Sequence, residues 1–89
     1  MNSAFYDYVI KIFERIKDEV NGKVRYFAYP EMDSVIFRVT FKAFQFEFAL
    51  HGVTERMNKG QAVDEIIEEV KAEYKKTLFS AFFRSGQRR

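Results

Sequence analysis

Residues 35–50 read VIFRVTFKAFQFEFAL, and the apolar residues in this stretch change parity halfway along. Up to Phe41 they occupy odd positions, and from Phe44 onward they occupy even positions. Side chains alternate between the two faces of a strand, so one straight strand cannot place both sets on the same side. Two strands joined by a two-residue turn at Lys42-Ala43 can do so. The sequence therefore predicts a β-hairpin with one wholly apolar face.

This hairpin implies a definite register between its two strands. On the apolar face the expected pairs are Phe41 with Phe44, Val39 with Phe46, Phe37 with Phe48, and Val35 with Leu50. On the opposite face they are Thr40 with Gln45, Arg38 with Glu47, and Ile36 with Ala49. The second face thus places a cation opposite an anion. The pairing defines the middle of the fold but names no function.

Further elements are predicted on both sides of the hairpin. They are a helix over 3–21, a strand over 23–29, a four-residue turn from Pro30, a short helix over 53–59 and a long helix over about 62–83. The apolar arc of the first helix comprises Phe5, Tyr6, Val9, Ile10, Ile12, Phe13, Ile16 and Val20. We expect a two-layer α+β domain of order α-β-β-β-α. In it, a three-stranded antiparallel meander is covered on one face by the N-terminal and the long C-terminal helix.

Length and composition bound the class of protein. Eighty-nine residues make a single domain over 1–89, in which residues 84–89 are expected to form a frayed basic tail. The chain has no cysteine, which excludes disulfides and thiolate metal sites. It shows neither a signal-peptide pattern nor an apolar run near the ~20 residues of a membrane span. We therefore expect a cytoplasmic protein without a membrane partner.

No residue pattern favours catalysis or cofactor binding. His51 is the only histidine and has Glu55 four residues on, but no serine lies in a nucleophile-elbow context. We interpret His51 as a partly exposed residue at a strand end. The acidic run Glu65, Glu68, Glu69 and Glu73 falls mostly on the solvent face of its helix. The glycines form no phosphate-binding pattern. The sequence thus predicts no enzyme, no metal and no cofactor.

Aromatic and basic residues meet on the sheet face that the helices leave open. Under the expected register, Phe27, Tyr29 and Ile36 lie there beside Arg25 and Arg38. Such a face can stack bases and neutralise phosphates. The same residue types are enriched at protein interfaces. A different register would instead bury part of the set in the core, and the sequence leaves these three readings open.

The end of the long helix, KKTLFSAFFR, is apolar on more than one side. Phe79 and Phe83 fall opposite the buried stripe of Ile67 and Tyr74, where an amphipathic helix should be polar. A helix of about 20 residues, about 30 Å long, exceeds strands of seven residues and can overhang the sheet. An apolar overhang followed by arginines is expected to bind a partner, unless the short helix at 53–59 folds back to cover it.

The order α-β-β-β-α resembles that of the double-stranded-RNA-binding domain over most of the chain. That family carries a lysine-rich KKxAK run at the start of its final helix, which meets phosphates across a groove. The matching stretch here is QAVDEIIEEV, which is acidic and would repel RNA. The resemblance therefore implies a fold and argues against that activity.

Together these observations predict a non-enzymatic protein–protein interaction domain that self-associates as a homodimer. The expected contact residues are Phe79, Phe82, Phe83 and Arg84, with Phe27, Tyr29 and Ile36 as a second patch. A small accessory protein of a phage or mobile element, or an inhibitor of a host complex, is one form such a domain takes. The alternative is a nucleic-acid-binding protein. It would use the aromatic sheet face with Arg25, Arg38, Lys75, Lys76, Arg88 and Arg89.

Overall fold

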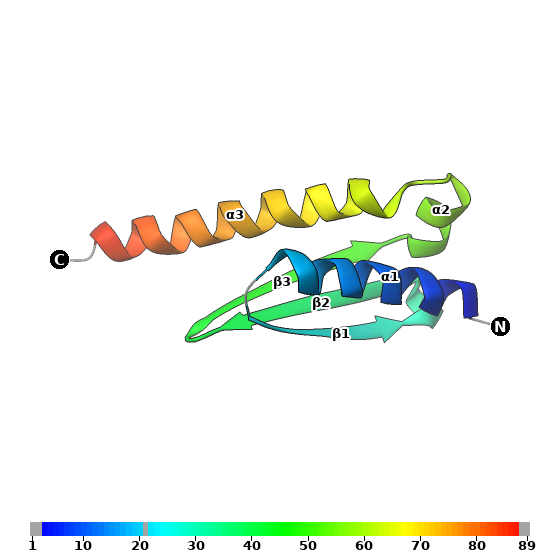
Figure 1. Ribbon diagram of the computed structural model, residues 1–89, viewed down its shortest axis with the longest axis horizontal. Coiled ribbons are helices and arrows are strands. Elements are labelled where there is room, and N and C mark those ends of the chain that lie inside the picture. Colours follow the sequence, from blue (N-terminus) through cyan, green and yellow to red (C-terminus); the bar gives the residue numbers. More distant parts are fainter. Residues whose placement is uncertain (1–2, 21, 88–89) are drawn as a thin grey trace.

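The computed structural model describes residues 3–20 and 22–87, with side chains described as far as residue 80. Its elements are α1 (Ser3–Glu19), β1 (Lys23–Tyr29), the 3-10 turn η1 (Pro30–Met32), β2 (Ser34–Phe41), β3 (Phe44–His51), α2 (Val53–Asn58) and α3 (Val63–Gln87). The strands form one antiparallel sheet in the order β1-β2-β3. Helices α1 and α3 lie over one face of it (Figure 1). The predicted two-layer α+β fold is confirmed.

The predicted strand register is confirmed at every pair. Phe41 lies opposite Phe44 at the turn, and Val35 lies opposite Leu50 at the far end. The first hairpin pairs Phe27 with Ile36. Lys42 adopts a φ of 55°, a left-handed conformation of the kind that tight two-residue hairpin turns require. The parity switch in the sequence therefore marks a turn between two strands.

The core lies between the sheet and the two helices. Its fully buried members are Val9, Ile12 and Ile16 of α1; Val35, Phe37, Val39 and Leu50 of the sheet; Ile66, Ile67 and Val70 of α3; and Val53 of the short helix α2. At the hairpin end, Tyr74 of α3 packs edge-on against Phe46, with ring centroids 5.4 Å apart. The inward-facing aromatic residues of the hairpin thus form the surface against which α3 packs.

The buried arc of α1 differs from the predicted one at its borders. Tyr6 and Ile10, expected inside, are 36% and 41% exposed, whereas Tyr8 is buried. The Tyr8 hydroxyl donates a hydrogen bond to the Gln61 carbonyl oxygen at 2.9 Å. The loop between α2 and α3 therefore covers one border of the arc and leaves the other in water.

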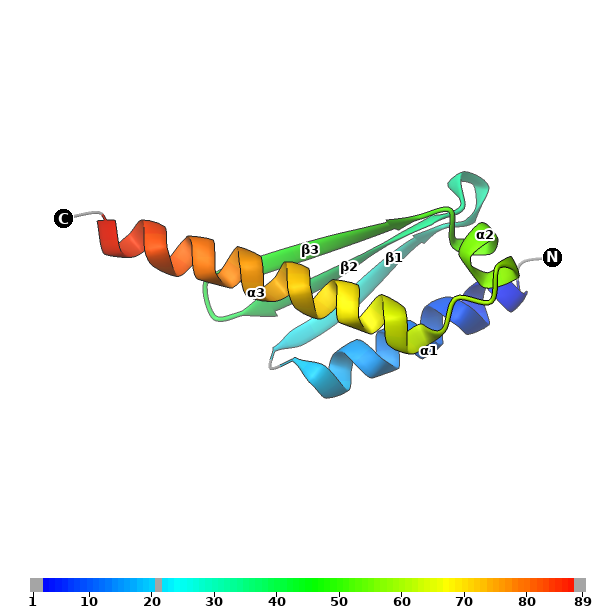
Figure 2. The same ribbon diagram turned by 90° about the horizontal axis from the view of Figure 1, so that it is seen from above.

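Helix α3 is longer than predicted and outruns the sheet. It extends through Gln87, four residues past the expected end at Phe83. Its 25 residues span about 37 Å, whereas the eight residues of β3 span about 26 Å. Seen from above, α3 runs diagonally from the side of α1 to the side of β3 and ends beyond the β2–β3 turn (Figure 2). The predicted overhang is therefore present.

Candidate interaction site

Exposed apolar side chains gather where α3 leaves the sheet. Leu78 is 41% exposed and Phe79 is 68% exposed, and Phe41 at the hairpin turn is 39% exposed. Phe41 lies opposite Phe44, whose ring packs against Tyr74, one helical turn before Leu78. These contacts connect the turn to the helix, and we call Phe41, Leu78 and Phe79 the apolar end.

The apolar end includes only part of the predicted contact set. Phe79 belongs to it, whereas the side chains of Phe82, Phe83 and Arg84 lie outside the described residues. Leu78 lies on the same helical stripe as Ile67 and Tyr74, which the sequence predicts to be buried. It is exposed because the sheet ends beneath Tyr74, so no strand lies under Leu78 for it to pack against. Helix α2 lies at the opposite end of the sheet and does not cover the apolar end (Figure 1).

The second predicted patch lies on the open sheet face, as the register requires. Tyr29 is 42% exposed, while Phe27 and Ile36 are half-buried against their neighbours. The Arg38 guanidinium lies 4.8 Å from the centroid of the Phe27 ring. Its Nε donates to Glu47 at 2.7 Å. Arg38 is therefore already engaged by an aromatic ring and a carboxylate of the same face.

The basic residues of the nucleic-acid alternative do not form one surface. Arg25 and Arg38 lie on the open sheet face, whereas Lys75 and Lys76 belong to α3 in the other layer. Arg88 and Arg89 lie outside the described residues. A continuous track for a phosphate backbone would need these cations on one side of the molecule. Of the basic residues named for this alternative, the four in the described part of the chain form two separated pairs.

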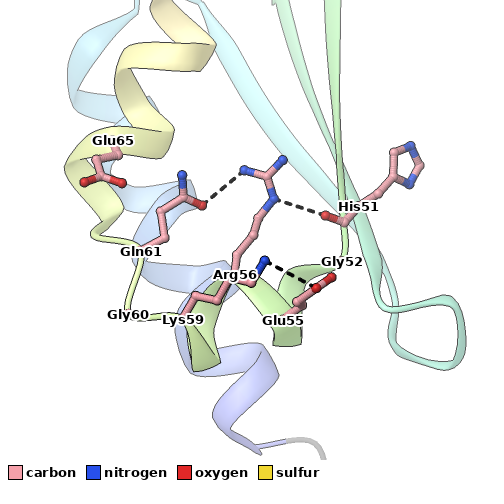
Figure 3. A pocket seen from close by; sticks show the side chains of 8 residues that line it. All are labelled: His51, Gly52, Glu55, Arg56, Lys59, Gly60, Gln61 and Glu65. Carbon is pink, nitrogen blue, oxygen red and sulfur yellow. Dashed lines mark hydrogen bonds and ion pairs between the residues drawn. The ribbon is translucent and has the colours of Figure 1, made fainter.

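His51 borders a polar groove of about 560 Å³ between α2 and the start of α3 (Figure 3). Its ring points away from Arg56, while its carbonyl oxygen accepts from Arg56 Nε at 3.1 Å. Arg56 Nη1 also lies 3.1 Å from Gln61 Oε1 and 3.3 Å from Glu69 Oε2. Both cations of the groove are paired with carboxylates, Arg56 with Glu69 and Lys59 with Glu55, so these ion pairs connect α2 internally and to α3.

His51 has a serine neighbour on the adjacent strand, β2. Ser34 Oγ lies 3.0 Å from His51 Nδ1, and it donates to the Met32 carbonyl oxygen at 2.9 Å. Ser34 lies opposite His51 in the pairing of β2 with β3. The two contacts of its hydroxyl therefore connect the end of β3 to the turn that precedes β2.

A second groove runs between the free edge of β3 and α3, with a volume of about 510 Å³. It is lined by Phe46, Glu47, Phe48 and Ala49 of β3, by Arg56 of α2, and by Glu69, Ala72, Glu73 and Thr77 of α3. Small residues at 72 and 77 leave room beside the strand. The strand order alone could have revealed this edge, because the third strand of a meander has one neighbour only.

Backbone groups of β3 face this groove. The pairs that flank a two-residue turn are hydrogen-bonded, so alternate residues, beginning with Gln45, turn their amide and carbonyl groups to the free edge. Glu47, Ala49 and His51 continue this series. The bond from Arg56 Nε to the His51 carbonyl oxygen fits that assignment. The edge from Gln45 to Ala49 therefore offers hydrogen bonds to an added strand.

Within residues 3–20 and 22–87, no helix is both long and apolar enough to cross a membrane. Comparison of the chain with models of protein families, with curated proteins and with solved structures finds no match. The likeness to the double-stranded-RNA-binding domain accordingly rests on the order of elements.

Proposed function

We propose that this protein is a self-associating interaction domain that acts by binding and not by catalysis. The observation that carries the proposal is the apolar end, where Leu78 and Phe79 are exposed together at the overhang of α3. Contiguous apolar surface of this kind marks sites of protein association in water-soluble domains. A cysteine-free chain is compatible with a reducing compartment, and we propose that it acts in the cytoplasm.

A protein partner fits the exposed surfaces better than a polyanion does. The cations suited to phosphates are divided between two layers, and Arg38 is paired with Glu47. The apolar end, by contrast, brings exposed apolar side chains of the hairpin turn and of α3 to the same end of the molecule. Aromatic and aliphatic side chains of this kind are the usual anchors of protein interfaces.

The oligomeric state tests the proposal. We expect light scattering on a concentration series to show a dimer for the native chain and a monomer for Leu78→Asp combined with Phe79→Asp. The matched control is Ile10→Asp, because Ile10 is exposed to the same 41% as Leu78 but lies on α1. That variant should remain dimeric.

Two results would overturn the proposal. One is a native chain that stays monomeric at the highest concentration reached. The other is a monomer that shifts DNA or RNA in a gel at low salt and releases it steeply as salt rises, which would assign the nucleic-acid function instead.

A further inference from the structure

We propose that two copies of this chain pair β3 against β3 in antiparallel orientation and join their sheets into one of six strands. The inference rests on the self-association proposed above and adds the surface and geometry through which it occurs. The free edge of β3, the charge order along α3 and the direction of the overhang support it independently.

The free edge of β3 has little protection against strand pairing, because the strand carries one charged residue, Glu47, and neither lysine nor proline. Natural edge strands are kept apart by lysine, proline, bulges or short length. Strand β3 has eight residues, FQFEFALH, and pairs with β2 without a bulge. The other edge strand, β1, begins with Lys23, carries Arg25 and runs directly into Pro30. Of the two edges, β3 is the one suited to receive another strand.

The occupant must fit the groove that lies beside this edge. On the groove side of α3, Glu69 and Glu73 line the wall, and Lys76 follows one turn after Ala72 on the same side. Beyond Glu73, the described part of α3 carries only basic charges. Two such helices are complementary when antiparallel, because the acidic half of each then meets the basic half of the other. A second copy supplies this complement.

The direction of α3 also favours a second copy. The helix crosses β3 toward its free edge and continues past the hairpin turn (Figure 2). In an antiparallel pair, that overhang extends over the sheet of the second copy. Leu78 and Phe79 are then covered by the partner. One dimer therefore accounts for both the open strand edge and the apolar end.

Side chains on the outer face select the register. A two-fold axis at Glu47 would place two carboxylates directly opposite each other, which is unfavourable. An axis at Phe46 instead sets Gln45 opposite Glu47 of the second copy. It also keeps the outward backbone groups of both residues in bonding positions. This register pairs an amide with a carboxylate and places the two Phe46 rings at the centre.

Cysteine cross-linking tests the register in a chain without native cysteine. Gln45→Cys and Glu47→Cys lie on exposed positions of the outer face. When the two variants are mixed and mildly oxidised, we expect a covalent dimer, because opposed strand residues lie within the Cα separation that disulfides span. Thr40→Cys, exposed on the middle strand, is the matched control and should give none.

A single proline substitution tests the backbone pairing separately. Glu47→Ala removes the carboxylate but keeps the amide, whereas Glu47→Pro also removes the outward N–H. Two hydrogen bonds are lost by symmetry, so the dimer Kd of the proline variant should exceed that of the alanine variant by roughly tenfold or more. Circular dichroism verifies that both variants are folded.

The outcomes separate the two proposals. A monomeric native chain overturns the self-association and this inference with it. A native dimer with equal Kd for Glu47→Pro and Glu47→Ala, and no cross-link between positions 45 and 47, overturns the inference alone. The inference also fails if Glu47→Pro leaves the dimer intact but abolishes binding of a different protein. The free edge of β3 would then pair with a strand of that protein and not with a second copy.

Discussion

The carboxylate of Asp33 caps helix α2 through Thr54. It accepts a hydrogen bond from the Thr54 amide at 2.9 Å and another from the Thr54 hydroxyl at 2.6 Å. The Asp33 carbonyl oxygen accepts from the Val53 amide at 3.0 Å. Gly52, at the N-cap position, has no side chain to do this. The turn between β1 and β2 therefore supplies the cap that α2 lacks in its own sequence.

Replacing Asp33 with alanine should lower the free energy of unfolding by about 1–2 kcal/mol, the usual effect of losing an N-cap side chain. Urea unfolding followed by circular dichroism measures it. Glu31→Ala is the control, since Glu31 is exposed in the same turn and should change stability by less than about 0.5 kcal/mol. Equal losses for both variants would contradict the capping role.

Removal of the Tyr8 hydroxyl should weaken the attachment of α1 to the loop before α3. Tyr8→Phe leaves the Gln61 carbonyl without its donor and is expected to cost about 1 kcal/mol near pH 7. The exposed Tyr6, changed to Phe, is the matched control. Urea unfolding of both variants at neutral pH tests this.

Tyr8 should also affect how the free energy of unfolding falls at alkaline pH. Burial raises the pKa of Tyr8 above its ordinary value of 10.0, with smaller contributions from nearby charges. The unfolded chain therefore ionises first, and the stabilisation present below pH 10 is lost as the pH rises toward the folded pKa. Unfolding free energies measured from pH 8 to 11 should fall less steeply for Tyr8→Phe than for the native chain. Identical slopes would refute this.

Gly22 should tolerate no side chain. It has a φ of 129°, and a Cβ there would lie 2.6 Å from the Thr40 carbonyl oxygen. We expect Gly22→Ala to destabilise by more than about 2 kcal/mol, because steric overlap adds to the conformational penalty. Gly60→Ala is the comparison: its φ is 75°, but the space around it is open, so about 1 kcal/mol is expected. Thermal unfolding distinguishes the two.

In the proposed dimer, charge reversals at Glu73 and Lys76 of α3 should compensate each other. Glu73→Lys or Lys76→Glu alone is expected to raise the dimer Kd by roughly threefold to tenfold, since each creates like-charge contacts twice across the two-fold axis. The double reversal should return it close to the native value. Sedimentation equilibrium at low salt measures this. A double variant weaker than either single variant would argue against antiparallel helices.

The hairpin was predictable because its information is local and redundant. The change of parity between Phe41 and Phe44 places the turn, and every later pair follows from it by alternation. Arg38 and Glu47 then meet on the other face without any further assumption. The four-residue turn after Tyr29 extended the same register to β1. Each of these steps depends on neighbours in the sequence.

Features that depend on distant segments were less accessible. Helical spacing places Tyr6 and Tyr8 at the borders of one arc, but the loop near Gln61 decides which of them is buried. The exposure of Leu78 depends on where the sheet ends under α3, which the helix sequence does not encode. The open edge of β3 was overlooked, although the absence of lysine and proline in that strand was a usable signal.

The meander joins every strand to its neighbour in the chain, and this has a consequence for the order of folding. Contacts between sequence neighbours form quickly, so both hairpins can close before the last helix reaches them. Until Ile66, Ile67 and Val70 arrive, the phenylalanines of the hairpin are covered from the side of α1 only. We expect stopped-flow refolding to show sheet formation first. The docking of α3 is then the late step that covers the remaining part of the hairpin and completes the core.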